Sequence, residues 1–324
     1  MIRGTGSQGQ GMPMLDPHFK AMLDAEAAAT PADSPPLEAL PLDVLRGFYQ
    51  AQRIGQNVGS TPADVKARDL SVPGLGGPIA VRLYTPPMAA NPAPCLVYFH
   101  GGGWVIGDLE THDAHCRRLA SYSDAKVLAV DYRLAPEHPF PAGHDDALEV
   151  TRWVFDHAAE IGVDPARIGV GGDSAGGNLA ASVAIDMRED VARRLKFQLL
   201  IYPALTPAEP TASRLELDGP VLSTAVMAFF EKSLAHADHP DWLRAAPAQV
   251  EDLRGLPPAL VVTAGFDPLQ DEGRDYALAL IDAGVRASHL HYSALVHDFY
   301  IMGDVSPAVV LAAEEAGAAI KAAL

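Results

Sequence analysis

The sequence has few cysteines and no long apolar run. Two cysteines, Cys95 and Cys116, occur in 324 residues, too few for the disulfide framework of a small secreted protein. Cys95 lies in an apolar run, and we expect it to be a buried thiol. No apolar stretch approaches the roughly 18 residues that suggest a transmembrane helix. These features predict a cytoplasmic protein without stable membrane anchoring.

Positive charge is also scarce. The sequence has 24 Lys and Arg against 41 Asp and Glu, which gives a net charge of −17. A surface of this sign repels phosphate backbones and anionic lipids, so nucleic acid is not expected as a partner.

Residues 1–11 lack the apolar stretch of a secretory signal. Their Gly, Ser and Gln content predicts a flexible tail or the remnant of a tag.

Hydrophobic residues make up 48% of the sequence, enough for a large core in one α/β domain or two small ones. From about residue 79 onward, short β-branched runs alternate with helical patterns, which predicts a mostly parallel sheet covered by helices on both faces. The expected strands are Lys66–Val72, Ile79–Tyr84, Cys95–Phe99, Ala125–Asp131, Arg167–Gly171, Phe197–Tyr202, Ala259–Thr263 and Ser288–Tyr292, of which the first two form an antiparallel hairpin. The expected helices are Thr111–Ser121, His144–Ile161, Ala175–Asp190, Asp271–Ala283 and Pro307–Ala323.

Two segments interrupt this alternation. Residues 12–60 have an amphipathic helical pattern broken by Pro31, Pro35, Pro36 and Pro41. Residues 204–250 form a long insertion with one clear helix, Leu222–Leu234. Long excursions within a compact domain are usually functional. We therefore expect the two segments to form a cap over the carboxyl ends of the strands; packed helices without a capping role are the less favoured alternative.

Two glycine-rich motifs follow apolar strands and indicate chemistry. His100-Gly101-Gly102-Gly103-Trp104 leaves backbone N–H groups free to bind an oxyanion, and Gly172-Asp173-Ser174-Ala175-Gly176 places a serine where a strand turns into a helix. Together they match the nucleophile turn and oxyanion loop of lipases and esterases. The N–H groups of Gly102, Gly103 and Ala175 are the expected oxyanion donors. Trp104 and Asp173 are expected near the substrate pocket, although Trp104 also suits a core position.

A serine nucleophile needs a base, and the base needs an acid to orient it. Asp267 is the first acid after the strand at residues 259–263, and His297 follows the next strand. The order serine, acid, histidine is the one that this type of site uses. We therefore predict a catalytic triad of Ser174, Asp267 and His297, with no cofactor or metal ion required.

The motifs resemble those of hormone-sensitive-lipase-type esterases, the bacterial family IV carboxylesterases. Four blocks of the sequence match the motifs of this family: His100–Trp104, Asp131–Ala142, Gly172–Gly177 and Leu256–Gly273. It implies an α/β-hydrolase fold with a mostly parallel eight-stranded sheet and a helical cap, spanning residues 1–324 as one domain. It also implies hydrolysis of short acyl esters, a small-molecule ester as the partner, and commonly a homodimer.

The chain departs from this family after the histidine, where Asp298 replaces the usual glycine. Arg133 and Glu137 of the second block are expected to be buried partners.

Two other functions fit the same motifs. One is an N-acyl or amide hydrolase with the same triad, and the other is a small-molecule receptor that keeps the pocket without turnover.

Overall fold

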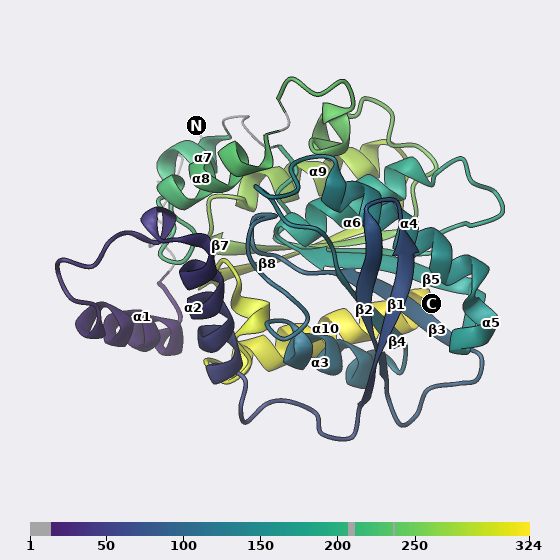
Figure 1. Cartoon of the computed structure of the whole chain (residues 1–324), viewed down its shortest axis with the longest axis horizontal. Coiled ribbons are helices and arrows are strands. Elements are labelled where there is room, and N and C mark those ends of the chain that lie inside the picture. Colours follow the sequence, from purple (N-terminus) through teal and green to yellow (C-terminus); the bar gives the residue numbers. More distant parts are fainter. Residues whose placement is uncertain (1–13, 207–210, 236) are drawn as a thin grey trace, which may run out of the picture.

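The computed structural model describes residues 14–206, 211–235 and 237–324, so the prediction for residues 1–11 lies outside the described residues. A single sheet of eight strands has the order β1-β2-β4-β3-β5-β6-β7-β8 (Figure 1). The strands are β1 (Lys66–Gly74), β2 (Gly77–Thr85), β3 (Ala93–Phe99), β4 (Lys126–Asp131), β5 (Val163–Asp173), β6 (Gln198–Ile201), β7 (Ala259–Phe266) and β8 (Ala287–Val296). β2 pairs antiparallel with β1 and β4, and the remaining pairs are parallel. The predicted hairpin and mostly parallel sheet are confirmed.

Helices cover both faces of the sheet and bury one hydrophobic core on each. The helices of the α/β layers are α3 (Asp113–Ser123), α4 (Ala142–Asp156), α5 (Ala158–Ile161), α6 (Ala175–Asp186), α9 (Gln270–Asp282) and α10 (Pro307–Ala323). α3 and α10 pack on one face, whereas α4, α6 and α9 pack on the other. Alternate residues of β3 enter the two cores, Val97 and Phe99 on one side and Leu96 and Tyr98 on the other. This period of two is that of a strand covered on both faces.

Two predicted helices are longer than those in the structure. The segment predicted as one helix over 144–161 is divided at His157, which has φ −113° and ψ 18°. The His157 ring stacks on Trp153 and contacts its carbonyl oxygen, and this local contact favours ending α4 there. α6 ends at Asp186 and does not reach Asp190.

The segment at residues 14–60, here called the N-terminal segment, consists of α1 (Pro17–Ala29), the short 3₁₀ turn η1 (Leu37–Ala39) and α2 (Leu42–Gly55). The predicted interruption by prolines is confirmed, because α1 and α2 lie on either side of them. The Asp16 side chain caps α1 by accepting hydrogen bonds from two backbone N–H groups. α2 buries Leu45, Tyr49 and Arg53, which share one face at a spacing of four. A buried arginine in that stripe is unusual and requires a partner.

The insertion at residues 204–250 contains more helices than the one predicted. Besides α8 (Thr224–Leu234) it has α7 (Ala212–Glu216) and the 3₁₀ turns η2 (Trp242–Arg244) and η3 (Pro247–Gln249). Figure 1 shows α7 and α8 on the same side of the molecule as α1 and α2. Direct contact between α8 and η1 joins the insertion to the N-terminal segment.

Candidate active site

Ser174 occupies the sharp turn between β5 and α6. Its φ of +53° is a left-handed backbone value, which is uncommon for a residue with a side chain. A Cβ atom at Gly172 would collide with the backbone of Gly176, and one at Gly176 would collide with the backbone of Phe99. Only glycine therefore allows so tight a turn at both flanking positions.

The structure brings the three residues of the predicted triad together. His297 Nε2 lies 3.0 Å from Ser174 Oγ, and His297 Nδ1 lies 2.7 Å from Asp267 Oδ2. All three side chains are buried. Asp267 follows β7 and His297 follows β8, two neighbouring parallel strands whose carboxyl ends meet at one edge of the sheet. We place the imidazole proton on Nδ1, because the Asp267 carboxylate accepts it, which leaves Nε2 free to accept from the serine hydroxyl.

Charge at the site favours the protonated imidazole. Burial lowers the pKa of His297, but the nearby carboxylates of Asp267, Asp298 and Asp173 outweigh this effect and raise that pKa above its ordinary value. The hydrogen bond from Nδ1 to Asp267 acts in the same direction. The site is therefore built to stabilise an imidazolium ion.

The glycine-rich loop after β3 lies against Ser174. Gly102 and Gly103 have φ values of +111° and +59°, which glycine adopts without strain. Their N–H groups have no acceptor among the described residues. An oxyanion hole requires donors of this kind, without partners inside the protein, and here two of them lie beside Ser174.

The structure places Asp173 behind this loop, fully buried, and it lines neither of the cavities found beside Ser174. Its carboxylate accepts hydrogen bonds from the Tyr98 hydroxyl at 2.7 Å and from the Gly101 N–H at 3.1 Å. His112 Nε2 lies 3.2 Å away. Asp173 therefore fixes the start of the glycine-rich loop. His115 of α3 packs between Tyr98 and Tyr300.

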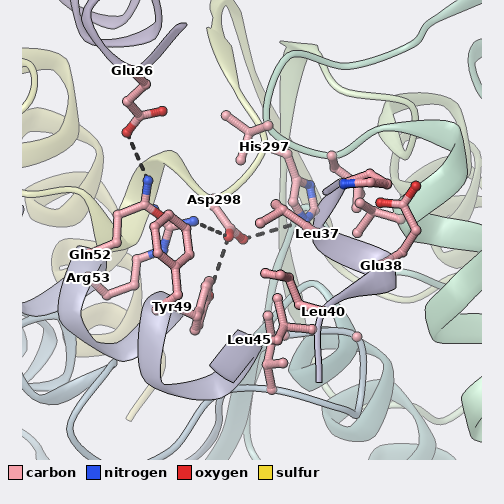
Figure 2. Close-up of a pocket in the computed structure, with 18 of the residues that line it drawn as sticks. Glu26, Leu37, Glu38, Leu40, Leu45, Tyr49, Gln52, Arg53, His297 and Asp298 are labelled. Atoms are coloured by element: carbon pink, nitrogen blue, oxygen red, sulfur yellow. Dashed lines mark hydrogen bonds and ion pairs between the residues drawn. The ribbon is translucent and has the colours of Figure 1, made fainter. Parts of the chain in front are cut away.

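Two cavities of very different size meet at Ser174. The larger has a volume of about 960 Å³ and extends past His297 between α1, η1, α2 and α8. Figure 2 shows its wall at α2 and the His297 loop. The smaller has about 20 Å³ and is bounded by Trp104, Met227 and Phe230. Trp104 is thus a wall of the small cavity and is itself almost fully buried.

Sequence reasoning missed the α2 residues that reach this site. Arg53 and Tyr49 both contact the carboxylate of Asp298, which directly follows His297. The only signal available was a polar residue in the buried stripe of an amphipathic helix.

The expectation that Arg133 and Glu137 are buried partners was wrong. Arg133 binds the buried Asp146, whereas Glu137 is exposed and pairs with Arg46 of α2. The backbone turns between Arg133 and Glu137, so the two side chains reach different elements: Asp146 is on α4 and Arg46 is on α2.

In the described part of the chain, no group of three or more His, Cys, Asp or Glu side chains could hold a metal ion. In that same part, no helix has both the length and the apolar character needed to cross a membrane. Cys95 and Cys116 are both buried free thiols, as expected for Cys95.

Comparison with known proteins agrees with this geometry. A family model described as alpha/beta hydrolase fold matches residues 96–301. The esterase LipI of Mycobacterium tuberculosis is 38% identical over 322 residues, covering 97% of this chain and 99% of LipI. An ethyl acetate hydrolase of Pseudomonas putida is 35% identical over 303 residues, covering 90% of this chain and 93% of that protein. The crystal structure of an ester hydrolase from the metagenome of Lake Arreo superposes with a TM-score of 0.90 at 40% identity, covering 95% and 99% of the two chains.

The chain belongs to the alpha/beta-hydrolase fold family. The predicted fold class and the resemblance to hormone-sensitive-lipase-type carboxylesterases are confirmed.

Proposed function

We propose that the protein is a serine carboxylesterase that cleaves short-chain acyl esters through an acyl-enzyme on Ser174. The observation that supports this most directly is the continuous contact from Ser174 Oγ through His297 to Asp267, at 3.0 and 2.7 Å. In this proposal, His297 Nε2 takes the hydroxyl proton while Oγ attacks the ester carbonyl carbon. Asp267 holds the imidazole in the required tautomer and stabilises its charged form.

The carbonyl oxygen becomes an oxyanion when the carbon turns tetrahedral, and the N–H groups of Gly102, Gly103 and Ala175 receive it. Ala175 is the first residue of α6, where the positive end of the helix dipole favours negative charge. The intermediate collapses as His297 gives its proton to the leaving alcohol. A water molecule activated by His297 then repeats the sequence and releases the acid from Ser174.

The two cavities suggest how the substrate binds. The leaving alcohol must lie next to His297, because His297 protonates it, and His297 lines only the larger cavity. The acyl group is then directed to the small cavity beside Trp104 and Phe230. A volume of about 20 Å³ is close to what one water molecule needs, so acetyl and similarly short acyl groups fit best. The name of the Pseudomonas putida relative, an ethyl acetate hydrolase, agrees with this preference.

We further propose that the N-terminal segment and the insertion form the cap of a single domain spanning residues 1–324. Both segments line the large cavity over Ser174, the first through Leu45 and Phe48 and the second through Phe229 and Phe230. The cap therefore governs which alcohol groups are accepted. A homodimer and a cytoplasmic location stay predictions from the sequence, and size-exclusion chromatography and cell fractionation would test them.

The experiment that tests this function is hydrolysis of p-nitrophenyl esters from acetyl to palmitoyl by the wild type and by Ser174→Ala. We expect turnover that is highest for the shortest chains and that falls on the order of 10⁴-fold or more in Ser174→Ala, to the residual rate of binding and the oxyanion hole. Ser182→Ala is a matched control, because Ser182 is a buried serine of α6 that lines neither cavity; it should retain activity. Activity of Ser174→Ala at the level of the wild type would refute the mechanism.

The same experiment addresses the other two functions. Turnover of anilides but not of the matching esters would favour an amide hydrolase. Labelling of Ser174 by an organophosphate without turnover of either class would favour a receptor.

A further inference from the structure

Asp298, directly after His297, adopts a backbone conformation that favours glycine. Its φ is +64°, within the left-handed region that costs energy for residues with a Cβ atom. The hormone-sensitive-lipase-type esterases, which the motifs of this chain resemble, usually have glycine at this position. Asp298 is nevertheless almost fully buried. A charged residue in such a position must be held by specific partners.

The two carboxylate oxygens of Asp298 face different groups. Oδ2 accepts a hydrogen bond from Arg53 Nη2 at 2.9 Å and one from the Tyr49 hydroxyl at 3.4 Å. Oδ1 lies 3.5 Å from His297 Nε2, the atom that exchanges protons with Ser174. Figure 2 shows this carboxylate between the α2 side chains and the imidazole. One buried carboxylate therefore contacts both the N-terminal segment and the catalytic base.

The carboxyl end of α2 is fixed to the segment that follows His297. Asn57 donates a hydrogen bond to the Ile301 carbonyl at 2.7 Å, and the Gln56 carbonyl accepts one from the Asp304 N–H at 2.9 Å. Together with the Arg53–Asp298 pair, these bonds hold the end of α2 and residues 297–304 in one arrangement. A change in the position of α2 would consequently change the charge beside the imidazole.

We propose that Asp298 is a positioning residue that couples α2 to the catalytic imidazole. Arg53 and Tyr49 hold its carboxylate beside Nε2, where it stabilises protonated His297, and the positive charge of Arg53 moderates this effect. The proposal deepens the esterase function above, since it rests on His297 acting as the base. It predicts that removing Asp298 and removing Arg53 change the basicity of His297 in opposite directions.

Several other ionisable groups face His297 and Asp298 and remain unchanged in the variants proposed below. From the neighbouring elements these are Asp173 at the end of β5, Tyr202 after β6, Asp267 after β7, and Tyr49 on α2, with Glu26 of α1 and Glu38 of η1 across the large cavity. Burial, followed by the charge of Asp298, raises the pKa of Tyr49, so this hydroxyl stays a protonated donor. Arg53 stays a cation: burial alone would lower its pKa, but the Asp298 carboxylate opposes burial and the net direction is upward.

The test is the pH dependence of kcat/KM for p-nitrophenyl acetate in Asp298→Asn and Arg53→Met. The acid limb of this profile reports the ionisation of the free enzyme's base. Asp298→Asn removes the carboxylate beside Nε2 and leaves Arg53, so the limb should move to lower pH by about one unit. Arg53→Met leaves the carboxylate without its cation, so the limb should move to higher pH. Shifts in the same direction, or no shift in either variant, would overturn the proposal.

Three further variants separate positioning from a merely structural role. Arg46→Met removes an arginine of the same helix whose partners are Glu137 and two backbone carbonyls outside the triad, so its acid limb should coincide with that of the wild type. Arg53→Lys keeps the cation and should restore the wild-type limb. Asp298→Gly suits the left-handed backbone and should fold even if Arg53→Met does not. The acid limb of the kcat/KM profile of Asp298→Gly must move to lower pH, and an acid limb that stays at the wild-type pH would overturn the proposal.

A direct titration distinguishes failure of this proposal from failure of the esterase function. The His297 imidazole is followed by NMR in isotope-labelled Ser174→Ala protein, with the resonance assigned by its loss in His297→Asn. Adding Asp298→Asn to Ser174→Ala should lower the titration midpoint, and adding Arg53→Met should raise it, whether or not any ester is hydrolysed. Unchanged midpoints would refute the coupling alone if the wild type hydrolyses esters. Opposite shifts, together with a wild type that hydrolyses no ester, would support the coupling and refute the esterase.

Discussion

Left-handed backbone conformations of non-glycine residues gather around the candidate active site. Among the described residues, six non-glycine positions have positive φ, and four of them, Trp104, Ser174, Tyr202 and Asp298, lie at the site. The Tyr202 ring lies 4.7 Å from that of His297. Each such position costs about 1–3 kcal/mol, and this cost persists only where the surrounding structure imposes the conformation. At the residue scale, backbone strain and catalytic chemistry therefore coincide.

The orientation of His297 depends on Asp267, and Asp267→Asn tests this dependence. An asparagine at this position favours the wrong imidazole tautomer, so we expect kcat to fall on the order of 10⁴-fold. The double variant Ser174→Ala/Asp267→Asn should be no less active than Ser174→Ala, because the triad acts as a unit. Steady-state kinetics of the three variants measure this. If the falls in kcat of the two single variants multiplied in the double variant, Ser174 and Asp267 would not act as one unit.

The charge around His297 sets the pH dependence of the wild type. His297 must be neutral to accept the Ser174 proton, and nearby carboxylates raise its pKa despite burial. Activity is therefore lost as pH falls through a value above the ordinary histidine pKa of about 6.5. The measurement is kcat/KM between about pH 5 and pH 9, read at the isosbestic wavelength of p-nitrophenol. An acid limb below the ordinary value would show that desolvation outweighs the carboxylates.

At the scale of single elements, we expect α8 to limit the length of the acyl group through Phe230. This ring lines the small cavity and approaches Gly103 so closely that a Cβ atom there would collide with it. We expect Phe230→Ala to raise kcat/KM for butyryl relative to acetyl esters by about tenfold, the effect of one or two accommodated methylenes. Phe229→Ala is the matched control, because Phe229 lines only the large cavity. Equal chain-length profiles in the two variants would place the acyl group elsewhere.

The elements differ in how far the sequence could predict them. The Ser174 turn and the Gly102–Gly103 loop were predictable because their glycines answer local constraints of the backbone. Asp267 and His297 were predictable from their places after consecutive parallel strands. The Arg53–Asp298 contact was not, because it joins residues 245 positions apart and depends on how α2 packs on the sheet. No local pattern specifies that packing.

At the scale of the whole molecule, two cores hold the sheet between helical layers. The strands β5, β7 and β8 thereby fix the edge from which Ser174, Asp267 and His297 project. The helices of the N-terminal segment and the insertion lie outside these layers, on the same side of the molecule (Figure 1). Catalytic groups are thus positioned by the rigid sheet, whereas the walls of the large cavity come mainly from segments that can vary independently.

The net charge of −17 belongs to the whole molecule and should influence which esters reach this cavity. Acidic Glu26 and Glu38 line it beside the mutually paired Arg53 and Asp298, so the charge of the lining has the same sign as that of the molecule. Salt screens such fields over a Debye length of about 8 Å at physiological ionic strength. We expect kcat/KM for an acetate ester with an anionic alcohol group to rise a few-fold between about 0.01 and 0.5 M NaCl, and that for acetylthiocholine to fall. Phenyl acetate, which is neutral, is the control and should change little. Equal salt dependence for all three would mean that the charge of the protein does not act on substrate binding.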